Sequence, residues 1–189
     1  LNMKKINAKS FARSFALLFV SLYATTANAQ LTINTGVTNA QLVAGFIGNG
    51  ITISNITRNC PSGAYGTFSN GGSTNLGITN GSVFTTGSAS GVDGFNNSDS
   101  YGYINGTTFS DPNLIAIEPS ATRDPCILTF NVVPSCTTLT IQFVFGSEEY
   151  PEFVNTSFND AVVFFVSGPN PAGGNYNAYN VARLPNAAK

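Results

Sequence analysis

The sequence predicts an all-β domain, built as an antiparallel sandwich or jelly roll with one short helix near its N-terminal end. Gly, Asn, Ser and Thr dominate the chain after residue 29, and the apolar runs between them are short. Several of these runs alternate apolar and polar side chains, as strands with one buried face do. Chains with many short strands and turn-rich connections typically fold into sandwiches or barrels.

Residues 1–29 are interpreted as a secretory signal peptide. Basic residues follow Met3, an apolar run extends from Phe15 to about Tyr23, and Ala27-Asn28-Ala29 has the small residues of a cleavage site. The apolar run is too short to span a membrane. We expect cleavage after Ala29, a secreted product without a transmembrane segment, and a natural start at Met3.

Residues 30–189 are expected to form one domain, which is long enough to bury a core and is rich in Phe. Its nine acidic and four basic residues give a net charge of −5, which argues against nucleic acid and anionic membranes as partners. The chain has no His and no Trp. It therefore lacks the usual general base and the commonest transition-metal ligand.

The predicted helix covers residues 38–47, TNAQLVAGFI. Thr38 is a candidate N-cap, and Gly48-Asn49-Gly50 is expected to end the helix. The apolar side chains recur at helical spacing, at Leu42, Val43, Phe46 and Ile47.

Residues 51–57 alternate apolar and polar side chains and predict a strand, and residues 82–86 predict a shorter one. Residues 87–112 contain almost no aliphatic side chains and are expected to form a long loop. Residues 161–167, AVVFFVS, predict a further, buried strand.

The strongest pair of predicted strands covers residues 126–133 and 137–145, CILTFNVV and TTLTIQFVF. Only Pro134-Ser135-Cys136 separates them. We therefore interpret the pair as an antiparallel hairpin.

Export into an oxidising compartment favours one disulfide among the three cysteines. In the predicted hairpin, Cys126 and Cys136 lie at opposite ends, roughly 25 Å apart at about 3.3 Å per residue. A disulfide does not span that distance. Cys60 is therefore expected to bond either Cys136 or Cys126.

An acidic segment follows the predicted hairpin, within residues 145–166. Four of the nine carboxylates lie within thirteen residues there, at Glu148, Glu149, Glu152 and Asp160. Carboxylates this close together repel one another unless water, hydrogen-bond donors or a cation compensates their charge.

The run FGSEEYPEFVNTSFNDAVVFFVSGP resembles the signature of the choice-of-anchor L domain, a bacterial extracellular domain. Other pieces agree in order along the chain: GITISNIT, GAYGTF, LGITNGSVFTTG, SDPNL and DPCILTFNVVP. The resemblance covers about residues 31–185. It implies a β-rich domain that is secreted or displayed on a bacterial cell surface, and it implies no catalytic residues.

The chain departs from the family pattern at its end, NVARLPNAAK, where further strands and a sorting region are expected. We therefore expect a fragment whose anchoring region lies outside this chain.

Two interpretations of the acidic segment remain open. Carboxylate and amide oxygens are the ligands that Ca²⁺ prefers, and the predicted calcium ligands are Glu148, Glu149, Asn159 and Asp160, with Asp111 and Asp124 from neighbouring loops. Alternatively, a glutamate accepts backbone N–H bonds that hold the long turn, and Asp160 caps the start of the next strand.

The function predicted from these observations is a non-catalytic, adhesin-like interaction domain that binds a surface glycan or protein. A structural spacer that displays a C-terminal module is the first alternative. A glycan hydrolase using Glu148 or Glu149 with Asp160 is the second. Adjacent glutamates in extended backbone point to opposite faces, so Glu148 and Glu149 are not expected to act together on one bond.

Overall fold

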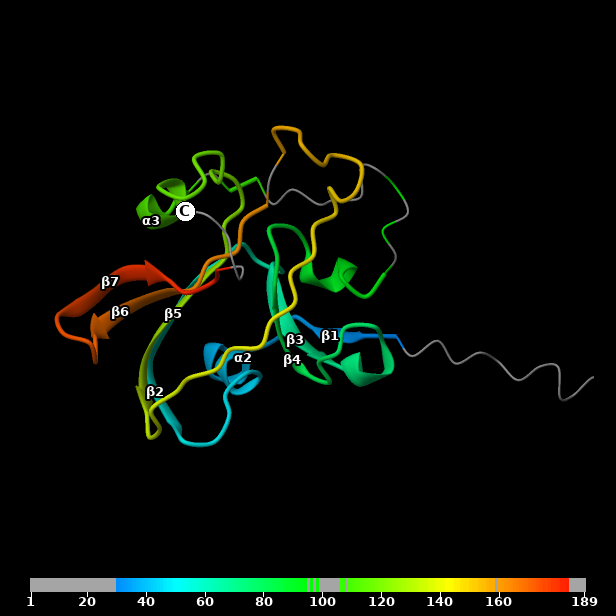
Figure 1. Cartoon of the computed structure of the whole chain (residues 1–189). Helices are drawn as coiled ribbons and strands as arrows, with labels where there is room; N and C mark the ends of the chain where they lie inside the picture. Colours follow the sequence, from blue (N-terminus) through cyan, green and yellow to red (C-terminus); the bar gives the residue numbers. More distant parts are fainter. Residues whose placement is uncertain are drawn as a thin grey trace, which may run out of the picture.

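The computed structural model describes residues 30–94, 96, 98, 106–107, 109–158 and 160–183. The predicted signal peptide lies outside these residues. The elements in chain order are β1 (Thr32–Asn34), α2 (Asn39–Ala44), β2 (Ile51–Asn59), β3 (Tyr65–Ser69), η1 (Gly71–Ser73), β4 (Gly81–Phe84), η2 (Ala89–Gly91), α3 (Pro112–Ile115), β5 (Ile127–Pro134), β6 (Phe165–Pro169) and β7 (Asn175–Asn180). All strand pairs are antiparallel, which confirms the all-β class (Figure 1). The sandwich arrangement stays a prediction.

Helix α2 confirms the predicted short helix and its Thr38 cap, but it ends at Ala44, before the expected stop at Gly48-Asn49-Gly50. Thr38 accepts a hydrogen bond from the Gln41 backbone N–H, and the Gln41 side chain accepts one from the Thr38 N–H at 2.8 Å. This reciprocal capping box satisfies two N–H groups that a helix start leaves unpaired. Leu42 and Val43 are buried against β2, β3 and β4, whereas Phe46 lies past the helix end and is 45% exposed.

One sheet has the order β1-β3-β4. Strand β4 begins one residue before the predicted strand and ends two residues earlier. The other two strands were not predicted: β1 has only three residues, and β3 contains Gly66 between its aromatic side chains. Gly66 is required there, because a Cβ would lie 2.6 Å from the Asn34 carbonyl oxygen of the paired strand.

The second sheet pairs β2 with β5, and this pairing shows that the predicted hairpin of residues 126–133 and 137–145 was wrong. Strand β5 pairs with β2 from Ile51 opposite Pro134 to Asn59 opposite Ile127, with one register shift between Ser54 and Thr57. The Pro134-Ser135-Cys136 link has no Gly or Asn for a tight turn. Ser135 continues the β2–β5 pairing instead, since its N–H donates to the Gly50 carbonyl at 2.8 Å.

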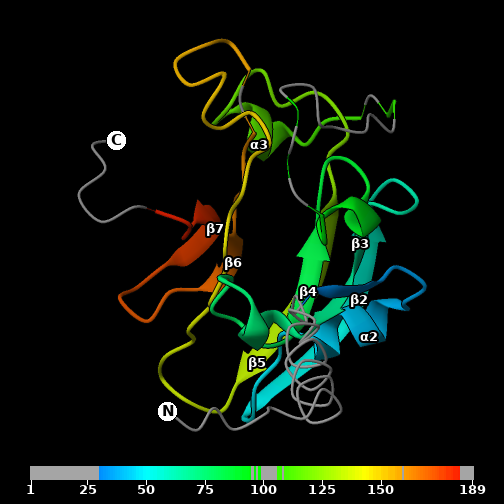
Figure 2. The same cartoon turned by 90° about the vertical axis from the view of Figure 1, so that its right-hand side faces the viewer.

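Strands β6 and β7 form the third sheet, set apart from the other two (Figure 2). Strand β6 begins four residues later than the predicted strand at 161–167. It starts opposite the end of its partner strand, because the register pairs Phe165 with Asn180, the last residue of β7. The sequence did not predict β7, whose Asn-rich composition is atypical of strands.

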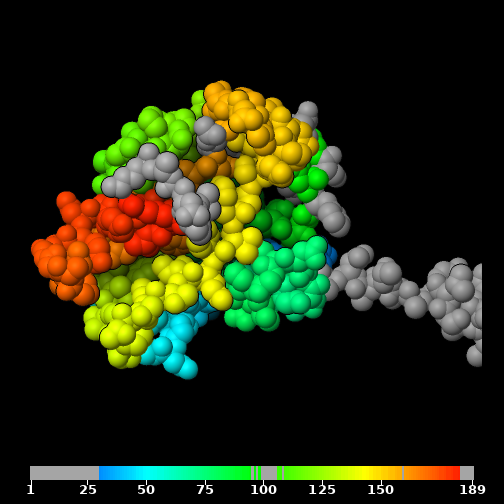
Figure 3. Space-filling model, viewed as in Figure 1, coloured from blue at the N-terminus to red at the C-terminus, as the bar shows by residue number. Residues whose placement is uncertain are grey.

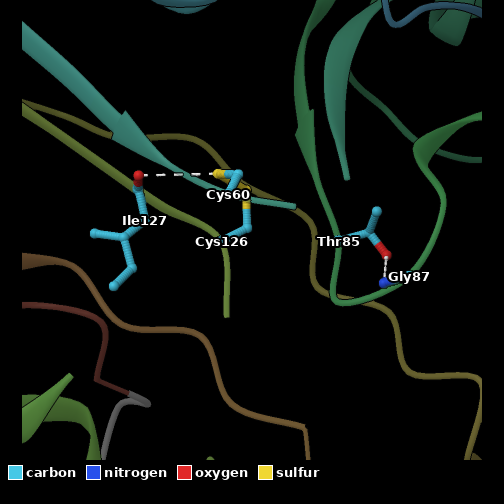
Figure 4. The surroundings of a disulfide bond; sticks show 5 residues. All are labelled: Cys60, Thr85, Gly87, Cys126 and Ile127. Carbon is cyan, nitrogen blue, oxygen red and sulfur yellow. Dashed lines mark hydrogen bonds between the residues drawn. A yellow bond between two sulfur atoms is a disulfide. The ribbon is translucent and has the colours of Figure 1, made fainter. Parts of the chain in front are cut away.

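The disulfide joins Cys60 to Cys126, one of the two pairings that the sequence left open, and Cys136 is an exposed free thiol. Cys60 follows the last residue of β2 and Cys126 precedes the first residue of β5, so the bond closes the end of this strand pair (Figure 4). The Cys60 Sγ atom of this disulfide also lies 3.8 Å from the Ile127 carbonyl oxygen.

In the described part of the chain the buried apolar residues are few, and two of them belong to α2: the set is Val37, Leu42, Val43, Ala64 and Ala89. Phe does not fill this interior. Among the described residues no Phe is fully buried, and Phe84, Phe143, Phe145 and Phe158 are between 39% and 59% exposed. Much of the large apolar surface of the chain is therefore accessible.

Replacing both Cys60 and Cys126 by Ala is expected to lower the free energy of unfolding by about 4 kcal/mol, from the loop-closure entropy of a bond that spans 66 residues. Urea denaturation measures this loss. Cys136→Ser is the matched control and should change the free energy of unfolding by less than about 0.5 kcal/mol. Equal stability of the double variant and the control would contradict the assigned pairing.

Candidate functional site

The acidic segment forms a loop of overlapping turns between residues 147 and 157. The Phe153 N–H donates to the Glu149 carbonyl at 2.8 Å, and the Thr156 N–H donates to the Phe153 carbonyl at 3.1 Å. The backbone at Glu148 and Glu149 is therefore turned. The prediction that these two side chains point to opposite faces assumed extended backbone, and that assumption was wrong.

Ser147 closes the base of this loop. Its hydroxyl donates to Asp160 Oδ2 at 2.8 Å and accepts from the Glu149 N–H at 3.2 Å. One side chain thus joins two residues that lie thirteen positions apart in the sequence. Asp160 accepts a side-chain hydrogen bond that holds the loop. The expected cap at the start of the next strand is not what it forms, because β6 begins five residues later, at Phe165.

A shallow hollow of about 270 Å³ lies in the loop. Its polar lining is Ser147, Glu149, Asn155 and Asp160, and its apolar lining is Tyr150, Phe153, Val154 and Phe158. The rings of Phe153 and Phe158 meet edge to face, with centroids 5.4 Å apart. Tyr150 is 71% exposed, so one face of the hollow presents a ring to the solvent.

Glu149 is the carboxylate that this arrangement perturbs. Desolvation raises its pKa above the usual 4.5, and the neighbouring charges of Asp160 and then Glu148 raise it further. No cation offsets this repulsion in the hollow, whose lining contains no Lys or Arg. The structure therefore brings Glu149 and Asp160 together.

The side chain of Glu148 is exposed and does not line the hollow. Its carbonyl oxygen accepts a hydrogen bond from Asn96 Nδ2 at 3.0 Å. This bond ties the acidic loop to the long loop predicted at residues 87–112, of which the structure describes a part.

The other predicted calcium ligands have separate roles. Asp111 is the N-cap of α3 and accepts from the N–H groups of Asn113 and Leu114, and Asp124 is 4% exposed and accepts from the Thr107 N–H at 2.7 Å. Asn159 lies outside the described residues. In the part of the chain that the structure covers, no three His, Cys, Asp or Glu side chains are grouped to hold a metal ion. Calcium binding stays a prediction.

Sequence reasoning missed the aromatic lining of the hollow, although Tyr150, Phe153 and Phe158 stand among the acidic residues. Their spacing fits neither a helix nor a strand, so no regular pattern indicated that they lie on one side of the segment. Aromatic side chains interleaved with carboxylates in a turn-rich loop are the signal that could have identified them.

A family model, Choice-of-anchor L domain, matches residues 30–189. No curated protein and no solved structure matches the chain. Among the described residues, none of the helices is both long and apolar enough to cross a membrane.

Glu149→Gln is expected to raise the melting temperature at neutral pH. The folded pKa of Glu149 is raised, so ionisation opposes folding and stability falls as the pH rises through that pKa. Well below pH 4.5 the carboxyl is protonated in both states and the gain should vanish. Melting curves at several pH values measure this.

Glu118→Gln is the matched control, because hydrogen bonds from the Ser120 side chain and backbone lower the pKa of Glu118. Its ionised form favours folding above the unfolded pKa, so this variant should not gain stability at neutral pH. A melting temperature for Glu149→Gln that stays unchanged at every pH would contradict the repulsion in the hollow.

The calcium prediction is tested by melting the protein in millimolar Ca²⁺ and in EDTA. A cation bound by the native state must raise the melting temperature. Asp160→Asn should abolish the rise, while Glu118→Gln, which changes a carboxylate that accepts hydrogen bonds from Ser120, should preserve it. Identical melting temperatures in Ca²⁺ and in EDTA would contradict calcium binding.

Proposed function

Because this chain belongs to the choice-of-anchor L domain family, we propose that it is an adhesin-like interaction domain whose acidic loop binds a glycan. The family places it among surface or exported domains, which are generally non-enzymatic. The glycan, the adhesive role and the use of the acidic loop are the content of the proposal.

The hollow in the acidic loop supports this function best. Sugar rings have apolar faces that pack on aromatic side chains, and Tyr150 offers an exposed ring beside Phe153 and Phe158. Sugar hydroxyls are hydrogen-bond donors, and the carboxylates of Glu149 and Asp160 accept such bonds. The same hollow presents both kinds of contact.

The loop is also held in shape for binding. The Ser147 side chain joins the two ends of the loop through its bond to Asp160 and also accepts from the Glu149 N–H. Asn96 ties the loop to a second loop through the Glu148 carbonyl. A loop that is already ordered loses less conformational entropy when a ligand binds. Loops held on a rigid scaffold are common binding sites.

Electrostatics favours a neutral or cationic ligand at this site. Glu149 already lies against the charges of Asp160 and Glu148, so an anionic sugar would add to the repulsion. The proposed ligand class is therefore a neutral or amino-substituted glycan.

A glycan array is expected to identify glycans that bind the protein. Tyr150→Ala should weaken their binding at least fivefold, which corresponds to about 1 kcal/mol of lost ring contact. Tyr179→Ala is the matched control, because Tyr179 is also exposed but packs on Tyr176 in β7, away from the hollow. Equal losses in both variants would contradict a role for the hollow.

The array also separates the alternatives. An array without any binder would favour the spacer, and binding of a protein instead of a glycan would change the ligand class. Turnover of a bound glycan that disappears in Glu149→Gln would identify a hydrolase, since Glu149 and Asp160 line one hollow.

A further inference from the structure

Residues 137–145 form an extended stretch without a strand partner, here called the open strand. It crosses the molecule between the β5 end and the acidic loop (Figure 1). Its sequence alternates as a strand does. No backbone hydrogen bond joins residues 139–145 to any other residue in the described part of the chain. Backbone groups of this kind are a template for pairing with another strand.

The side chains of the open strand are large, apolar and accessible. Their exposed fractions lie between 44% and 56%, at Leu139, Ile141, Phe143, Val144 and Phe145. Four of these residues alternate along the strand and therefore share one side of it. Figure 3 shows the segment at the surface, beside the β6–β7 sheet. Phe164, which precedes β6, contacts the Phe143 ring at a centroid distance of 5.1 Å.

The open strand has no device against self-pairing. Exposed edges are usually protected by charged side chains or by Pro within the strand, but residues 125–147 contain no charged residue, and Pro134 lies before the open strand. Two copies of this stretch can therefore approach without like-charge repulsion.

We propose that a second copy of this chain pairs with the open strand, antiparallel and about a two-fold axis. The five large residues are each about half exposed, so together they offer on the order of 500 Å² of accessible surface per copy, and the pairing covers the part that faces the partner strand. A symmetric pair covers the open strands of both copies in a single contact.

Charge selects the antiparallel orientation. Glu148 and Glu149 follow the open strand closely, whereas its other end adjoins the uncharged Ser135 and Cys136. A parallel pair would set two acidic loops side by side. The antiparallel pair separates them and sets each loop near the uncharged end of the partner. The dimer then presents two hollows, which would strengthen binding to a repetitive surface.

Full overlap of the nine residues places Ile141 opposite Ile141 of the second copy, which makes the interface testable at one position. Sedimentation velocity over a range of concentrations is expected to show a monomer–dimer equilibrium. Ile141→Lys should weaken the dimer at least about tenfold, because like charges directly opposite each other oppose pairing. Val92→Lys is the control, since Val92 is 47% exposed on a different segment and should leave the dimer intact.

A second experiment does not depend on the fold tolerating a lysine. Ile141→Cys in a Cys136→Ser background should form a disulfide-linked dimer under mild oxidation, and Val92→Cys in the same background should not. A wild-type monomer at every concentration, a dimer unaffected by Ile141→Lys, or equal cross-linking at both positions would each overturn the proposal. Loss of glycan binding alone would not affect it, because the hollow lies outside the open strand.

Discussion

The bond between Cys60 and Cys126 is the constraint on which the rest of the structure depends. It joins residues 66 apart in sequence at the ends of β2 and β5. A crosslink of this length removes much of the entropy cost of bringing two distant strands together. Strand β5 can then pair with β2, and a local partner is not required.

That pairing determines what happens to the chain after β5. Residues 137–145 have the composition of a strand, but the edge of β5 that a hairpin would use is not hydrogen-bonded to them. The segment crosses the molecule instead and leads into the acidic loop (Figure 1). The exposed position of residues 137–145 and that of the acidic loop thus both follow from the pairing of β5 with β2.

The two surfaces differ in chemistry and suit different contacts. The open strand is uncharged and offers backbone groups and apolar side chains, which suits pairing with an identical strand. The loop combines carboxylates with exposed rings around a small hollow, which suits a polar ligand with apolar faces. An exported domain that binds a ligand through one surface and a second copy through the other would bind as a divalent unit.

The sequence by itself determined the all-β class, the capped helix at Thr38 and the family, because these follow from short-range patterns of apolar, polar and turn residues. Tertiary structure alone decided that β5 pairs with β2, that Cys126 bonds Cys60, and that Glu149 meets Asp160 across a hollow. Each of these contacts joins residues far apart in the chain or depends on how a loop turns. Local pattern carries no information about such contacts, since a strand sequence is satisfied by any partner that offers hydrogen bonds and a matching apolar face.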